Sequence, residues 1–163
     1  MTVISKDGAA KKFLNQIIKQ LDSKNVKVGW FPSAKYPDGK PVAQVAYTNE
    51  FGDVNKHIPP RPFMRPTIRE KRSTWNHVLE KNLKRVLLGE IDLEIALKLL
   101  GEEASGDVKD TIASIWSPPL AERTKQERLK KLKNKKETKS LYKPLIDTGI
   151  MFNTCLSEVT DEE

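Results

Sequence analysis

Apolar side chains recur at helical spacing in the first half of the chain. Between Ala10 and Leu21 they are spaced three and one residues apart, which is typical of an amphipathic helix. The same periodicity predicts a longer helix that opens at Pro66, where proline suits the first helical turn, and that ends at Gly89. These two stretches predict two surface helices that pack through one apolar face each.

Three further stretches favour helices. Residues 92–116 carry one apolar stripe, and Asp92 is placed to act as the N-cap. Residues 121–133 are predicted to form a short helix. The apolar positions in 42–51 fit a helix or a strand, and we favour a short buried helix because Gly52 is suited to end it.

Two short stretches read as strands. Residues 26–31 alternate between polar and apolar positions, and residues 156–159 form a weaker final strand. No β-α-β alternation separates them, so the sheet should be small and antiparallel. We therefore expect an α+β fold in which a small antiparallel sheet packs with several helices. The 163 residues suit one domain, 1–163, with a basic segment at 123–143 inserted in it.

A stiff segment precedes the second long helix. Four prolines fall within 59–66, and they hold the backbone extended at little entropic cost. Two interpretations are open. The segment is a linker with Phe63 in the core, or it is an exposed subunit contact in which Arg61 and Arg65 pair with carboxylates of the next subunit. The two are compatible if Phe63 faces inward and both arginines face outward.

Several segments together resemble one protein family. Asn49-Glu50-Phe51-Gly52 is followed by Ile58-Pro59-Pro60-Arg61-Pro62-Phe63, a long helical middle, Ser117-Pro118-Pro119-Leu120 and Pro144-Leu145-Ile146-Asp147-Thr148-Gly149. This order, over roughly residues 26–159, resembles the tail-completion (virion morphogenesis) proteins of tailed bacteriophages, the group that includes the minor tail protein Z of lambda-like phages. Ile150 departs from the pattern, since members often carry a basic residue there.

The resemblance implies a structural virion protein and no enzyme. It would be made in the cytoplasm of the host bacterium and would end in the tail or neck of the virion. It would form a homo-oligomeric ring at or near the head–tail junction and would dock onto other tail or neck proteins. In that setting Arg61, Phe63 and Arg65 are the candidate subunit-interface residues. No cofactor, metal or membrane is implied.

Charge is concentrated in one segment. Residues 123–143 hold ten Lys/Arg against two Glu, whereas the rest of the chain is near neutral, although the whole carries +7. Three interpretations stay open: a solvated loop, a contact with acidic patches on neighbouring subunits, or a non-specific contact with DNA phosphates in the tail lumen. The residues that would make either contact are Lys130, Lys131, Lys133, Lys135 and Lys136. A small basic nucleic-acid-binding protein is the alternative function.

Candidate chemistry is sparse. Asp147-Thr148-Gly149 after two apolar residues matches the active-site sequence of retroviral-type aspartic proteases, but the 14 residues after Gly149 are too few for that barrel. We expect Asp147 or Thr148 to cap a last helical turn instead. The two histidines lack metal-binding spacing, no phosphate-binding loop is present, and nothing near Cys155 would lower the pKa of its thiol. A lone cysteine and no long apolar run favour a protein kept in a reducing cytoplasm.

Overall fold

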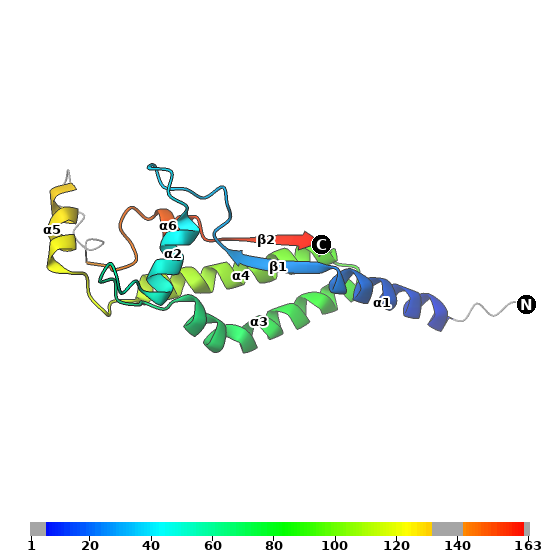
Figure 1. The fold of residues 1–163 in the computed structure, drawn as a ribbon. Coiled ribbons are helices and arrows are strands. Elements are labelled where there is room, and N and C mark those ends of the chain that lie inside the picture. The colour runs from blue at the N-terminus through cyan, green and yellow to red at the C-terminus, as the bar shows by residue number, and fades with distance from the viewer. Residues whose placement is uncertain (1–5, 132–141, 162–163) are drawn as a thin grey trace, which may run out of the picture.

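The computed structural model describes residues 6–131 and 142–161. Their elements follow in the order α1 (Lys6–Asp22), β1 (Lys24–Gly29), α2 (Val42–Phe51), α3 (Met64–Leu87), α4 (Leu93–Ser114), α5 (Glu122–Lys131), α6 (Ile150–Asn153) and β2 (Leu156–Asp161). The molecule is elongated along α3 and α4, which lie side by side (Figure 1). Both strands lie along α4 on the side away from α3. The α+β prediction with a small antiparallel sheet is confirmed.

The sheet joins segments from opposite ends of the chain. Strand β1 pairs antiparallel with β2, with Val26 opposite Val159 and Gly29 opposite Leu156. The predicted first strand was placed two residues too late, because its pairing ends at Gly29. Trp30 then packs edge-on against Phe63, with ring centroids 5.6 Å apart, and leaves the ladder.

Helix α4 is the central element because it packs against α3 and against both strands. Gly101 allows the close approach to the sheet: a Cβ at this position would lie 2.6 Å from Cβ of Ser157. On the α3 side, the buried carboxylate of Asp107 accepts a hydrogen bond from Trp75 (2.8 Å) and pairs with Lys71 (2.8 Å). Gly101 has a low intrinsic helix propensity, yet the packing of α4 against the sheet requires a glycine at this position.

Two clusters of buried apolar side chains form the core. The larger one joins α2, α4 and the segment that leads into β2, and its buried members are Val42, Ala46, Phe63, Val108, Ile112, Leu145, Met151 and Cys155. The smaller one lies where α1, α3 and α4 meet, and its buried members are Ile17, Val86, Leu93, Ala96 and Leu97. The smaller cluster is built from helix faces alone, whereas the larger one also takes Phe63, Leu145 and Cys155 from outside the helices.

Helix boundaries depart from the predictions by one or two residues, except that α1 begins at Lys6, four residues before the predicted apolar stretch. Helix α3 begins at Met64, so Pro66 is its third residue, where its missing N–H removes no intrahelical hydrogen bond. Asp92 holds the N-cap position of α4, but its side chain makes no capping hydrogen bond. Gly52 ends α2 with a positive φ of 78°, as the sequence suggested. Within the described ranges no helix is both long and apolar enough to cross a membrane.

Candidate functional site

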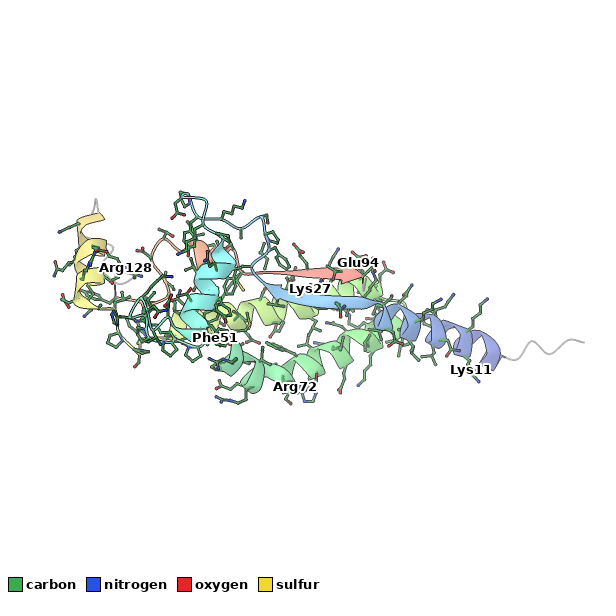
Figure 2. All side chains as sticks on the ribbon, viewed as in Figure 1. Lys11, Lys27, Phe51, Arg72, Glu94 and Arg128 are labelled. Atoms are coloured by element: carbon green, nitrogen blue, oxygen red, sulfur yellow. The ribbon has the colours of Figure 1, made fainter. Side chains whose placement is uncertain are left out.

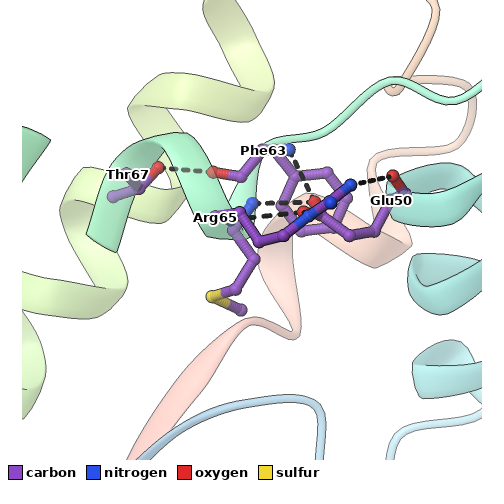
Figure 3. A network of polar contacts seen from close by, with 5 residues as sticks. Glu50, Phe63, Arg65 and Thr67 are labelled. Atoms are coloured by element: carbon purple, nitrogen blue, oxygen red, sulfur yellow. Dashed lines mark hydrogen bonds and ion pairs between the residues drawn. The ribbon is translucent and has the colours of Figure 1, made fainter. Parts of the chain in front are cut away.

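A buried carboxylate joins the two segments that carry the family resemblance. Glu50, at the end of α2, is 4% exposed and lies at the start of α3 (Figure 3). Its carboxylate accepts backbone N–H hydrogen bonds from Phe63 (2.6 Å), Met64 (2.9 Å) and Arg65 (3.2 Å). Glu50 therefore caps α3 from outside that helix, where its negative charge also interacts favourably with the helix dipole.

Arg65 also binds Glu50, and we call the contact of Glu50 with the start of α3 the Glu50 joint. Its Nε donates to the Glu50 carboxylate at 2.9 Å, and its Nη2 donates to the Glu50 carbonyl at 3.3 Å. Burial by itself would raise the pKa of Glu50, but the hydrogen bonds from Arg65 and from the three backbone N–H groups outweigh it. The pKa of Glu50 therefore lies below its ordinary value, so the carboxylate is charged at neutral pH.

Gly52 lets the proline segment approach α2. With φ at 78°, a Cβ on Gly52 would lie 2.8 Å from the Ile58 carbonyl oxygen and 2.9 Å from the Pro60 nitrogen. One step further along the segment, the Arg61 N–H donates to the Asn49 carbonyl at 2.7 Å. The end of α2 and the proline segment thus form one rigid unit, as the stiffness of the sequence indicated.

The three candidate interface residues have different surroundings. Phe63 is 1% exposed and lies in the larger core cluster, so its inward orientation is confirmed. Arg65 keeps 59% of its side chain exposed although it pairs with Glu50. The outward orientation expected for Arg61 is wrong: it is 5% exposed and donates to the carbonyls of Pro118 (2.7 Å) and Pro119 (2.9 Å). Arg61 is an internal clamp, because those carbonyls have no helix partner after α4 ends.

Three large apolar side chains near this joint are exposed, and we call them the α2–α3 patch (Tyr47, Phe51 and Ile68). Their exposed fractions are 66%, 50% and 45%. The two rings lie 4.7 Å apart, and the guanidinium of Arg65 lies 4.7 Å from the centre of the Phe51 ring. Figure 2 shows Phe51 between α2 and α3. The predicted helix is confirmed, but it is buried along one face only, that of Val42, Ala46 and Glu50, and these aromatic side chains face outward.

Sequence reasoning missed the α2–α3 patch for a definable reason. Helix α2 carries two adjacent faces with the same spacing of four residues, one formed by Val42, Ala46 and Glu50 and the other by Tyr47 and Phe51. Hydropathy favours burial of both faces of α2, and among the five residues it makes Glu50 the least suited to burial. Only the position of α3, which needs a carboxylate at its first turn, selects the face that is buried.

A second exposed apolar surface lies on α1, and we call it the α1 face (Phe13, Leu14 and Ile18). Their exposed fractions are 44%, 45% and 53%, whereas Ile17 of the same helix is buried in the smaller core cluster. Helix α1 extends beyond the end of the α3–α4 pair (Figure 1), and Figure 2 shows Lys11 on this projecting part. The predicted amphipathic helix is confirmed, but its apolar side is only partly covered.

A cleft of about 680 Å³ lies between α2, the proline segment and residues 144–151. Arg61 and Arg128 line this cleft, but both donate hydrogen bonds to backbone carbonyls. Arg128 donates to the carbonyls of Lys143 (2.8 Å) and Ile146 (3.0 Å). No group of three or more His, Cys, Asp or Glu side chains that would hold a metal occurs in 6–131 or 142–161.

Asp147 holds Arg128 instead of capping a helix. The Asp147 carboxylate lies 3.3 Å from Nε of Arg128, whose side chain is 10% exposed. Gly149 occupies the N-cap of α6 in a left-handed conformation, and only Thr148 comes near a capping role, through a 3.4 Å contact with the Ile150 N–H. The expectation that Asp147 caps this turn is therefore wrong, whereas Thr148 makes a long version of that contact.

This arrangement predicts how Asp147 variants behave. We expect Asp147→Asn and Asp147→Ala to lower the free energy of unfolding by a similar amount, about 1 kcal/mol each, because both remove the charge that faces Arg128. A capping residue would instead tolerate asparagine well. Urea denaturation of the two variants tests this. An asparagine variant as stable as wild type, beside a weakened alanine variant, would contradict the ion-pair role.

Cys155 is fully buried in the larger core cluster. Burial raises the pKa of its thiol to about 11, against the smaller opposing effect of Lys109. We expect native protein to resist maleimide labelling at pH 7 to 8, and denatured protein to react within minutes, because the thiolate is the reactive form. Rapid labelling of native protein would show that the core around β2 opens. The expectation that nothing nearby lowers this pKa is wrong, since Lys109 does so, but burial outweighs that effect and the net shift is upward.

The basic segment, 123–143, is described at its start, 123–131, and in its last two residues, 142–143. Helix α5 carries Lys130, whose side chain is exposed, and ends at Lys131. Two ion pairs, Arg123–Glu127 and Lys125–Glu122, neutralise part of its charge. Lys133, Lys135 and Lys136 lie outside the described residues, so their predicted contacts stay predictions.

Comparisons of the chain with protein-family models, with curated proteins and with solved structures found no match.

Proposed function

We propose that the protein is a non-enzymatic structural component of a tailed-bacteriophage virion. It acts in tail completion, at or near the head–tail junction, by forming a ring of identical copies and by docking onto tail or neck proteins. The order of sequence segments resembles that family, as described above. The rigid joint around Glu50 suits such a part, because preorganised segments lose little entropy when they bind.

One observation carries the proposal: large apolar side chains are exposed on two separate surfaces of an elongated molecule. The α1 face lies on the projecting helix, and the α2–α3 patch lies beside the proline segment. Exposed apolar clusters of this kind commonly mark protein–protein contacts. Two different surfaces favour head-to-tail contacts, and such contacts close into a ring when the rotation between copies permits.

Binding of DNA remains the second candidate, and one observation favours it. Helix α3 carries seven Lys/Arg against two Glu, a concentration hidden by the near-neutral charge of the chain outside 123–143. Arg72 lies on this helix (Figure 2) and is exposed. One observation speaks against DNA binding: three basic residues of α3 already pair with carboxylates, namely Arg65, Lys71 and Arg85.

Native mass spectrometry at increasing protein concentration, with and without duplex DNA, separates the two functions. The structural proposal expects one discrete oligomer that forms without DNA. The alternative expects a monomer that shifts only when DNA is added, with an affinity that falls steeply as salt is raised. A monomer at all concentrations, with no mass shift on addition of purified tail proteins, would contradict the structural proposal.

A further inference from the structure

The outer edge of β1 is unpaired in the described part of the chain. Strand β1 pairs with β2 along one edge, and no other segment within 6–131 or 142–161 pairs with its second edge. In an antiparallel pair, every second residue directs its backbone N–H and C=O away from the partner strand. These groups form a row of donors and acceptors that a further extended segment can complete.

An apolar pocket of about 220 Å³ lies directly beside this edge. Its apolar walls come from β1, α3 and α4, and they are formed by Val26, Val28, Trp75, Leu79, Leu100 and Ala104. All of these side chains except that of Ala104 are only half-buried. Arg72 and Asn76, at exposed positions of α3, form the polar rim. We call the free edge of β1 together with this pocket the β1 groove.

The β1 groove is suited to an extended polypeptide segment. Backbone hydrogen bonds along a free strand edge hold such a segment in place, and a pocket beside the edge receives its alternate side chains. An aliphatic side chain in this pocket would remove its half-buried walls from water. A helix does not fit, because its backbone groups are already paired with each other and cannot bond to the edge.

One stretch of this chain outside the described residues has the matching chemistry. Residues 1–5, Met-Thr-Val-Ile-Ser, contain no charged side chain and three consecutive β-branched residues, which favour strands. The other two stretches are charged: 132–141 contains four lysines and Glu137, and 162–163 consists of two glutamates. Because a charged side chain is costly to place in an apolar pocket, residues 1–5 are selected as the occupant.

A copy cannot place residues 1–5 in its own β1 groove. Helix α1 follows them, and its 17 residues span about 25 Å. This helix extends away from the body of the molecule, and β1 continues from its opposite end (Figure 1). Five extended residues reach at most about 17 Å. The segment is therefore too short to return along α1 to the β1 of its own chain.

We infer that residues 1–5 of one copy add as a strand to the free edge of β1 in the next copy. An apolar side chain of the segment, Val3 or Ile4, enters the pocket between β1 and α3. Donor segment and groove are different surfaces, so the contact is head-to-tail and each copy uses both. The inference rests on the proposed self-assembly and adds the contact through which it occurs.

Substitutions on each side test the contact by native mass spectrometry. Asn76→Trp places a bulky ring at the rim of the groove, and Val3→Glu with Ile4→Glu puts carboxylates on the donor segment. Each variant is expected to need more than about tenfold higher concentration to assemble. Two matched controls are expected to assemble as wild type does. Ser73→Trp adds the same ring at an exposed position of α3 outside the groove, and Val3→Ile with Ile4→Val keeps the segment apolar and β-branched.

The outcomes separate this inference from the proposed function. Circular dichroism shows whether every variant folds. If wild type assembles and both variants assemble equally well, the inference fails while the proposed function stands. If Asn76→Trp is impaired but the glutamate variant is not, the groove holds another segment and the inference fails. Equal impairment by Ser73→Trp would place the contact on the outer side of α3 and also overturn it. A wild type that remains monomeric under all conditions would overturn both the inference and the proposed self-assembly.

Cross-linking gives an independent readout. Cys155 is the only cysteine and is buried, so Ile4→Cys and Asn76→Cys chains each carry one introduced thiol. A short bismaleimide is expected to join the two chains when they are mixed, and to give little product when Ser73→Cys replaces Asn76→Cys. Absence of the mixed product while wild type assembles would overturn the inference. A cross-link within one chain that carries both thiols, formed below the concentration of assembly, would show the segment in its own groove and overturn it too.

Discussion

Phe63→Ala is expected to lower the free energy of unfolding by about 3–5 kcal/mol. Phe63 is 1% exposed and packs edge-on against Trp30 in the larger core cluster. Rigid neighbours surround it, because Glu50 holds its backbone N–H and Thr67 donates to its carbonyl at 2.6 Å. The cavity left by alanine therefore collapses little, which places the cost in the upper range for such substitutions. Urea denaturation followed by circular dichroism measures it.

Phe51→Ala is the matched control for Phe63→Ala. Phe51 has the same side chain on the same rigid unit but is 50% exposed, so we expect a loss of about 1 kcal/mol or less. If Phe63→Ala does not fold, Phe63→Leu, with an expected loss of about 1.5 kcal/mol, keeps the measurement possible. Equal losses for the Phe51 and Phe63 alanine variants would contradict the burial of Phe63.

Glu50→Ala is expected to lower the free energy of unfolding by about 3 kcal/mol. The change removes the acceptor of three backbone N–H groups at the start of α3 and leaves them without a partner. It also frees Arg65, which is largely exposed and contributes little of this loss. Glu80→Ala, at an exposed position of α3, is the control and is expected to cost less than about 0.5 kcal/mol.

The same carboxylate predicts a dependence on pH. Since the pKa of Glu50 is lowered in the folded protein, its contribution is complete above the ordinary glutamate pKa of about 4.3 and is lost as pH falls through the folded value. Glu50→Gln lacks this titration. We therefore expect the stability difference between wild type and Glu50→Gln to be largest near neutral pH and to shrink in acid. A difference that stays constant down to the acid transition would show that the charge of Glu50 is not what stabilises α3.

The sequence determined the local structure of this protein. Apolar spacing located the long helices to within a few residues, because helix and strand periodicity are properties of a single segment. Prolines 59–66 indicated a rigid extended segment, and Phe63 was a candidate core residue from its place between prolines. The small antiparallel sheet followed from the lack of β-α-β alternation and from two short strands far apart in the chain.

Only the tertiary structure decided which faces are covered and where charges find partners. Tyr47 and Phe51 face solvent while Glu50 is buried, because α3 begins beside α2 and needs an acceptor for its first N–H groups. Arg61 turns inward because the chain after α4 brings two free carbonyls to it. The apolar side of α1 is left uncovered because the body ends before the helix does. Each of these outcomes depends on contacts between segments that are distant in sequence, and a local pattern of residues does not predict such contacts.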